Sequence, residues 1–238
     1  MKKINFTLKT ALLAVFSLSA EATVLTHSYQ FQGNLDDSVG SLALISDGGV
    51  IGSGSYSFGM NQGLVLTGAL AAVDSYSIAL NFNFSSLNGW QKIIDFSGLG
   101  SDMGFYTLHD KLDFYNINNA VGPTPLTVST NVDVVITRDG STQEFNAYLN
   151  GVKQFSFIDT GSLAVFNGGS GNSIHFFEDD SRTDFREAAP GVVNSIRIWD
   201  GALTESQVSN INAVPIPAAA WLFAAGLGLL SYKSHRKI

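Results

Sequence analysis

The chain has 238 residues, no cysteine and a formal net charge of −7, from 20 acidic and 13 basic residues. The lack of cysteine excludes disulfide scaffolds, thiol catalysis and the Cys/His patterns of zinc sites. Six of the basic residues lie near the two ends, so residues 23–213 carry seven basic and nineteen acidic side chains, a net charge of −12. This acidity excludes a nucleic-acid backbone as the partner and suits an extracellular protein or a divalent cation.

The first 22 residues have the pattern of a secretory signal peptide. Two lysines follow Met1, residues 11–18 are an apolar run, and Ala20-Glu21-Ala22 offers the small residues that a signal peptidase reads. We therefore expect cleavage after Ala22 and export of the chain. The alternative is that this segment forms an amphipathic first helix of the domain.

Residues 23–212 contain short segments in which polar and apolar side chains alternate, which is typical of β-strands. In the clearest segment, residues 76–84, the apolar side chains occupy every second position and share one face: Tyr76, Ile78, Leu80, Phe82 and Phe84. Similar patterns predict strands at 131–138, 145–149, 153–158 and 194–199.

Local signals give the connections between these strands. Asn150-Gly151 is the pair that favours a two-residue hairpin turn. One short helix is expected at 204–211, with Thr204 as its N-cap and Gln207 in the reciprocal position. About a dozen short strands with glycine-rich turns predict an all-β, antiparallel two-sheet sandwich.

Four segments, taken in order, carry a family resemblance. They are residues 29–38 (YQFQGNLDDS), 75–84 (SYSIALNFNF), 148–152 (YLNGV) and 195–204 (SIRIWDGALT). Together they resemble the concanavalin A-like, laminin-G-like jelly roll over residues 28–211. The resemblance implies the fold but no ligand, because this fold carries lectins, glycanases and adhesion modules alike.

The sequence gives no catalytic motif. Enzymes of the resembled fold class carry closely spaced carboxylates on one strand, and no such triplet is present. The densest acidic group contains Glu178 and Asp180, which share a face only if a strand continues through Asp180, whereas Ser181 and Arg182 indicate a loop. We expect no catalysis. A glycoside hydrolase with unrecognised catalytic residues is the alternative.

Two acidic groups are candidate calcium sites, since Ca²⁺ takes six to eight oxygen ligands from flexible loops. The candidate ligands are Asp36 and Asp37 in the first loop, beside Asn34, and Glu178, Asp179, Asp180 and Asp184 in the later one. The alternative is that these are solvated loop carboxylates. In that case residues 34–37 form an Asx turn, and Arg182 and Arg186 neutralise part of the second group.

Glycan binding requires a flat aromatic side chain beside polar groups. Trp90, which follows the polar stretch Ser85-Ser-Leu-Asn-Gly, is the main candidate, with Tyr106 and Tyr115 as further ones. Trp199 lies in a predicted strand and is expected in the core. For Trp90 the alternative role is packing beneath a loop.

The C-terminal segment begins with a stiff proline motif and ends with basic residues. Residues 216–232 are 17 in number and would span about 25 Å as a helix, slightly less than the roughly 30 Å of a hydrocarbon core. The segment resembles a PEP-CTERM sorting signal, the substrate of an exosortase. The residues that match the signal are Val214, Pro215, Ile216, Pro217, Trp221, Arg236 and Lys237.

This second resemblance implies how the chain travels. The tail would insert transiently in the membrane with its basic tip on the cytoplasmic side, and the exosortase would then cut near the proline motif. Proteins with such tails go with exopolysaccharide and biofilm matrix. An ordinary C-terminal anchor is the alternative.

The sequence therefore predicts three parts: a signal peptide at 1–22, a laminin-G-like jelly roll at 23–212 and a sorting signal at 213–238. We expect an exported, non-catalytic protein that binds carbohydrate or has a structural role in an extracellular polysaccharide matrix. The alternatives are a glycoside hydrolase of the same fold and an adhesion module without a glycan ligand.

Overall fold

The computed structural model describes residues 23–166 and 172–211. The signal peptide predicted for residues 1–22 and the sorting signal predicted for 213–238 lie outside the described residues. Within the described ranges, no helix has both the length and the apolar character needed to cross a bilayer.

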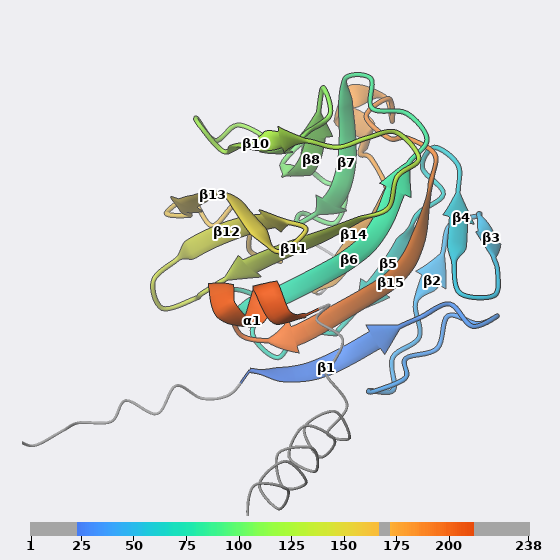
Figure 1. The fold of residues 1–238 in the computed structure, drawn as a ribbon, viewed down its shortest axis with the longest axis horizontal. Coiled ribbons are helices and arrows are strands. Elements are labelled where there is room, and N and C mark those ends of the chain that lie inside the picture. Colours follow the sequence, from blue (N-terminus) through green and yellow to red (C-terminus); the bar gives the residue numbers. More distant parts are fainter. Residues whose placement is uncertain (1–22, 167–171, 212–238) are drawn as a thin grey trace, which may run out of the picture.

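The described residues form fifteen strands, one 3₁₀ turn and one α-helix (Figure 1). In chain order these are β1 (Val24–Tyr29), β2 (Ile45–Ser46), β3 (Val50–Ile51), β4 (Tyr56–Phe58), β5 (Leu64–Thr67), β6 (Tyr76–Phe84), β7 (Trp90–Asp95), β8 (Gly104–Leu108), β9 (Lys111–Phe114), β10 (Val121–Pro125), β11 (Val132–Arg138), β12 (Glu144–Leu149), β13 (Val152–Ile158), β14 (Ser173–Phe176), η1 (Ser181–Thr183), β15 (Gly191–Asp200) and α1 (Glu205–Asn210).

The strands form two antiparallel sheets that pack face to face. The eight-stranded sheet has the order β13-β12-β11-β6-β15-β4-β3, with β1 paired to the C-terminal half of β15. The seven-stranded sheet has the order β10-β9-β8-β7-β14-β5-β2. The predicted all-β jelly-roll sandwich is confirmed, and Figure 1 shows the long strands of the first sheet curving together, with α1 on their outer side.

Aromatic side chains fill the space between the sheets. The alternating apolar face of β6 lies entirely in this core, as the sequence predicts. Phe114 of the seven-stranded sheet meets Phe145 of the other sheet edge to face, with ring centroids 5.1 Å apart. Burying each such ring stabilises the fold by about 1.5–3 kcal/mol, so a phenylalanine-rich core replaces the missing disulfides.

The predicted local signals are also confirmed. Asn150 and Gly151 have φ of 51° and 78° and join β12 to β13 in a tight hairpin, which requires two residues that tolerate positive φ. Thr204 caps α1, and the side chain of Gln207 bonds back to the cap, which completes a capping box. The helix places Val208 against the outer face of the eight-stranded sheet, beside Ala79.

Candidate functional site

A row of buried polar side chains crosses the outer face of the seven-stranded sheet. Lys92 on β7 is the register partner of Tyr106 on β8, which in turn faces Asp113 on β9. Phe105 and Phe114, the neighbours of Tyr106 and Asp113 in sequence, enter the core. Because side chains alternate along a strand, the row points to the opposite face, where another part of the chain must cover it.

The cover is the acidic segment of residues 177–187. β14 ends at Phe176, and Phe177 takes a positive φ of 61° that turns the chain out of the strand. Both ends of the segment are then held on β7, since Phe177 N–H donates to the Ile93 carbonyl at 3.0 Å and Lys92 N–H donates to the Glu187 carbonyl at 2.7 Å. The loop predicted here from Ser181 is confirmed, and it lies against the buried lysine.

Lys92 neutralises part of this segment. Its ammonium, which is fully buried, lies 2.5 Å from Asp180 Oδ2, 3.3 Å from Asp95 Oδ2 and 3.4 Å from Asp179 Oδ1. Burial alone would lower the pKa of Lys92, but the hydrogen bond with Asp180 and the charge of the nearby carboxylates raise it above its ordinary value. The lysine therefore stays charged inside the protein.

The two carboxylate oxygens of Asp179 have different partners: one accepts two hydrogen bonds, and the other has only an ion pair. Its Oδ2 accepts hydrogen bonds from Thr183 Oγ1 at 2.6 Å and from the Glu187 N–H at 2.8 Å. Its Oδ1 is buried and accepts no hydrogen bond; its one charged contact is the 3.4 Å ion pair with Lys92. An ion pair of that length is too long for a hydrogen bond of ordinary strength, so Oδ1 is only partly compensated.

Asp179 is also one of three carboxylates that converge at this segment. One oxygen each from Asp102, Asp179 and Glu187 lie within 4.8 Å of one another. Burial, and then repulsion from Asp102 and Asp179, raise the pKa of Glu187 to about 7. Tyr106 donates its hydroxyl to the Asp102 backbone oxygen at 3.0 Å and to Asp102 Oδ1 at 3.2 Å, which links this cluster to the aromatic side chains.

The three aromatic residues predicted from the sequence as glycan contacts lie together. The Trp90 ring meets both Tyr106 and Tyr115 edge to face, with centroids 5.4 Å apart in each case. Tyr106 is fully buried at the base, whereas Trp90 and Tyr115 are partly exposed. We call these three residues together with Asp102, Asp179 and Glu187 the aromatic–carboxylate site.

The residues of the first predicted calcium group make other contacts. Asp37 Oδ1 accepts the N–H groups of Ser28 and Val39, and its Oδ2 lies 2.5 Å from His27 Nδ1. Burial alone would raise the pKa of Asp37, but these hydrogen bonds lower it below its ordinary value. Asp36 is exposed, and its N–H donates to Asn34 Oδ1 at 3.3 Å, which is the Asx turn weighed above.

The second predicted calcium group is divided among several partners. Glu178 Oε2 pairs with His175 Nδ1 at 2.7 Å, and Asp180 pairs with Lys92. Asp184 is exposed and pairs with Arg186 at 2.8 Å. Of the predicted ligands in this group, Asp179 alone joins the carboxylate cluster of the described residues.

No sequence pattern points to Asp102 and Glu187. Glu187 lies nine residues after Glu178 in the acidic segment, whereas Asp102 lies in the β7–β8 loop, far away in sequence. No spacing rule joins the two positions. The structure brings them together through the anchoring of the acidic segment on β7.

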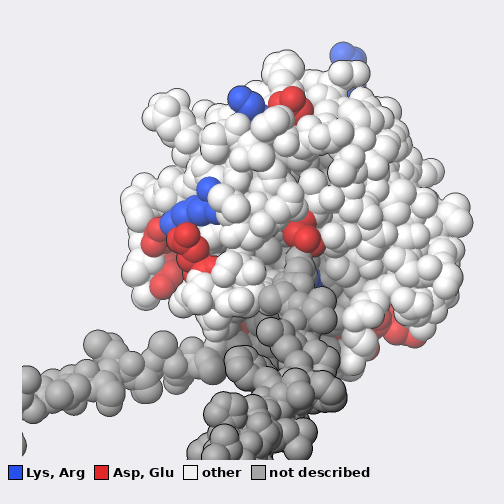
Figure 2. Space-filling view, in the orientation of Figure 1, with Lys and Arg blue, Asp and Glu red and all other residues white. Residues whose placement is uncertain are grey.

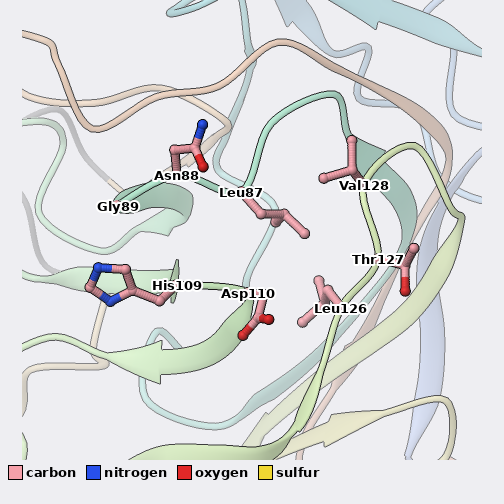
Figure 3. Close-up of a pocket in the computed structure, with 8 residues that line it drawn as sticks. All are labelled: Leu87, Asn88, Gly89, His109, Asp110, Leu126, Thr127 and Val128. Atoms are coloured by element: carbon pink, nitrogen blue, oxygen red, sulfur yellow. The ribbon is translucent and has the colours of Figure 1, made fainter.

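A second feature is an open pocket of about 760 Å³ at the rim of the sandwich (Figure 3). It is lined by Leu87, Asn88, Gly89, His109, Asp110, Leu126, Thr127 and Val128. Figure 3 shows the Leu87 side chain pointing into the space between Asp110, Leu126 and Val128. No Trp, Tyr or Phe lines the pocket, but its β6–β7 loop leads directly into Trp90.

Comparison with protein families assigns the fold. The family model described as the concanavalin A-like lectin/glucanases superfamily matches residues 58–209. The chain belongs to this superfamily. A search of curated protein sequences finds no significant match.

Solved structures with this superfamily fold share little sequence with the chain. Domain 4 of AbnA, an extracellular arabinanase from Geobacillus stearothermophilus in complex with arabinotriose, is 18% identical with a TM-score of 0.59, over 80% of this chain and 98% of that domain. The binding domain of botulinum neurotoxin serotype D is 12% identical with a TM-score of 0.57, over 79% of this chain. Trypanosoma rangeli sialidase is 13% identical with a TM-score of 0.58, over 78% of this chain.

The lengths of these proteins differ. This chain spans 51% of the toxin domain and 32% of the sialidase. At such identities the likeness shows the fold alone, since one fold carries many unrelated activities. The function has to be argued from the site.

Proposed function

We propose that the protein is a non-catalytic carbohydrate-binding module and that the aromatic–carboxylate site is its binding site. The observation that carries the proposal is the convergence of Trp90, Tyr106 and Tyr115 beside Asp102 and Glu187. Partly exposed rings next to hydrogen-bond acceptors are the combination that a sugar needs. A domain of the same fold, domain 4 of the arabinanase, is known in complex with arabinotriose.

Each part of the site has a distinct task in this proposal. The ring faces of Trp90 and Tyr115 would pack against the apolar C–H face of a sugar ring. The carboxylates of Asp102 and Glu187 would accept hydrogen bonds from its hydroxyl groups, and bonds to charged acceptors are the stronger kind. Tyr106 lies beneath and holds Trp90 in place, so little side-chain freedom is lost on binding.

Glycan binding is tested by titrating the purified protein with plant and bacterial polysaccharides in a calorimeter. Trp90→Ala should weaken binding at least tenfold. Trp199→Ala is the matched control. The expectation that Trp199 lies in the core is wrong: it is partly exposed and packs on the outer face of the other sheet, on β15. Equal loss in both variants, or no saturable binding by the unchanged protein, would contradict the proposal and favour an adhesion module without a glycan ligand.

A second candidate function is glycoside hydrolysis at the same site. The observation that favours it is Glu187, whose pKa of about 7 would keep a proton available for a leaving group near neutral pH. A second carboxylate, Asp102, lies close by, as retaining hydrolysis requires. The pair weighed from the sequence is less suited, since Glu178 is bonded to His175 and Asp180 is fully buried against Lys92.

Hydrolysis predicts reducing ends that accumulate with time and disappear in Glu187→Gln. Binding without hydrolysis predicts a constant amount of polysaccharide and no new ends. The same incubation, sampled over hours, therefore separates the two candidates.

The termini suggest where the protein acts. We propose that a signal peptidase removes residues 1–22 and that an exosortase-type enzyme cuts near Pro217, after transient membrane insertion of the tail. The product would be an extracellular or cell-surface protein of a polysaccharide matrix. The mass of the protein recovered from culture medium tests both cuts.

The surface charge agrees with a glycan rather than a nucleic-acid partner, because the domain is acidic. On the face shown in Figure 2, the charged side chains form small separate groups, and no continuous basic patch is seen.

A further inference from the structure

We infer that the protein has a second binding site, on the outer face of the eight-stranded sheet, and that this site takes an amino sugar whose amino group is free and protonated. The site is a pocket of about 270 Å³ between the segment that begins α1 and the strands β11, β12 and β13. The choice of a sugar rests on the proposed function, whereas the pocket and its charge do not.

The walls of this pocket come from two parts of the chain. Thr137 of β11 is the register partner of Asn146 of β12, and both line the pocket. Tyr148 of β12 is the register partner of Lys153 of β13, and these line it too. Leu203, just before α1, packs on Tyr148 on the outer side of the sheet, where Figure 1 shows α1. The pocket therefore lies on the opposite side of the sandwich from the aromatic–carboxylate site.

The hydroxyl group of Tyr148 is the observation that points to a ligand. Tyr148 is 2% exposed, and within the described ranges its hydroxyl has no hydrogen-bond partner. The other buried tyrosines all donate to an oxygen: Tyr29 to Leu42 O at 2.8 Å, Tyr56 to Gln62 O at 2.8 Å, Tyr76 to Ala164 O at 2.6 Å and Tyr106 to Asp102 O at 3.0 Å. Because a buried tyrosine hydroxyl usually finds a partner, the exception at a pocket indicates a group that comes from outside the chain.

The charge of the pocket favours a cationic ligand. Asp139, Glu144 and Glu205 line it with a single ammonium, that of Lys153. Lys153 lies 3.7 Å from Glu144 and both side chains are partly exposed, so this ion pair is weak and leaves the carboxylate open to a ligand. Burial, and then the charges of Glu205 and Glu144, raise the pKa of Tyr148 to about 12, so its hydroxyl lies near both carboxylates and keeps its proton. A protonated amino group between the two carboxylates could also donate to this hydroxyl.

The neutral groups of the pocket suit the rest of a sugar unit. Asn146 uses little of its hydrogen-bonding capacity: among the described residues its Oδ1 accepts no bond, and its Nδ2 lies 3.4 Å from Thr137 Oγ1. Leu203 and the Tyr148 ring supply an apolar wall. The volume is slightly below the roughly 300–1,000 Å³ of sites for drug-sized ligands, so the pocket suits one sugar unit. An amino sugar offers one ammonium, several hydroxyl groups and an apolar C–H face.

A second site would make the protein bivalent. The two sites lie on the outer faces of different sheets and point away from each other, so one molecule could hold two polysaccharide chains. Simultaneous binding at two sites raises the overall avidity without any new contact. The protein would then cross-link a matrix that contains amino sugars.

The first test is a calorimetric titration with a glucosamine trisaccharide and with its fully N-acetylated form. At about pH 6 the carboxylates are ionised and the amino groups protonated. The free-amino form should bind about tenfold more tightly, as expected for hydrogen bonds to a charged group, and its binding should weaken with added salt. Equal binding of the two forms, or no binding of the free-amino form, would overturn the inference. Lysine amide that binds as tightly as the trisaccharide would show that the pocket recognises an ammonium alone, and would overturn the assignment to a sugar.

Matched variants then locate the site. Glu205→Gln should weaken binding of the trisaccharide about tenfold, whereas Asp36→Asn, which changes an exposed carboxylate elsewhere, should not. Tyr148→Phe removes the hydroxyl and keeps the ring, so it should weaken binding about threefold or more. It should leave the melting temperature unchanged, because no hydrogen bond within the protein is lost. Unchanged binding by both pocket variants would overturn the inference, and so would a lower melting temperature of Tyr148→Phe, since the hydroxyl would then have a structural partner.

Trp90→Ala separates this inference from the proposed function. Trisaccharide binding that persists in Trp90→Ala and falls in Glu205→Gln supports the second site, whether or not the aromatic–carboxylate site binds a glycan. Binding that is lost in Trp90→Ala and kept in Glu205→Gln would place the amino sugar at the aromatic–carboxylate site. That result would overturn the second site and leave the proposed function intact.

Discussion

The two sheets have very different outer faces, although they share one core. α1 covers part of the eight-stranded sheet with apolar contacts, in which Val208 and Leu203 pack on Ala79, Val135 and Tyr148. An acidic segment covers the seven-stranded sheet and encloses a buried lysine. The first cover is an ordinary extension of the hydrophobic core, and the second is held by charge.

The apolar cover and the charged cover therefore have different roles, one in stability and the other in function. An apolar cover adds free energy of folding and needs no partner. A charged cover costs desolvation of every group that it buries, and that cost is recovered only if each charge is paired. In this protein one buried lysine faces several carboxylates, so the second cover is the place where a ligand or ion has most to contribute.

The largest expected effect comes from removing the lysine of the charged cover. Lys92→Met should lower the free energy of unfolding by about 3–5 kcal/mol, because it leaves buried carboxylates without a counter-charge. Denaturant unfolding measures the change. The control is Lys153→Met, whose ammonium lies 3.7 Å from Glu144 at the surface and should cost less than about 1 kcal/mol. Similar losses in the two variants would show that the acidic segment does not depend on Lys92.

The apolar cover should respond next most strongly. Leu203→Ala removes a side chain that packs under α1 and should cost about 2–3 kcal/mol, toward the lower end for buried leucines because the site lies near the surface. The loss should be the same at low and high salt, since no charge is involved. A salt-dependent loss would mean that the two covers are coupled through the core.

The cap of the same helix gives a smaller effect. Thr204→Ala should cost about 1 kcal/mol, because the Gln207 N–H loses its acceptor. Ser209→Ala, an exposed change within the helix, should alter stability by less than about 0.5 kcal/mol. Thermal unfolding of both variants measures the difference. Equal stabilities would show that the capping box does not stabilise this cover.

The same contrast explains what the sequence could predict. The strand β6, the Asn150-Gly151 hairpin and the Thr204 cap depend on residues close together in the chain, and all three are confirmed. The face covered by α1 follows from such local patterns. Short strands such as β2 and β3, with two residues each, carry too little periodicity to be identified.

The charged site was predicted only in part. Trp90, Tyr106 and Tyr115 were chosen for their residue type, and their meeting depends on the register of β7, β8 and β9. The pairing of Asp180 with Lys92 joins residues 88 positions apart, and no local rule anticipates it. Carboxylates are easy to find in a sequence, but their partners decide whether they are free to bind an ion.

The smallest expected effect is a pH dependence that belongs to the charged cover alone. Glu187 has a folded-state pKa of about 7 against an ordinary value of 4.5, so the folded protein binds the proton more tightly than the unfolded chain does. Its contribution to stability should be complete below about pH 4.5 and should be lost as the pH rises through 7. Because Glu187 is partly exposed, solvent screening should keep the effect below about 1 kcal/mol.

Melting curves between pH 4.5 and 8 measure this slope, and Glu187→Gln should flatten it in the upper half of the range. Asp113, whose pKa burial raises to about 6, should contribute in the same direction at lower pH, and Asp113→Asn separates the two groups. A slope that survives both substitutions would place the titrating group elsewhere.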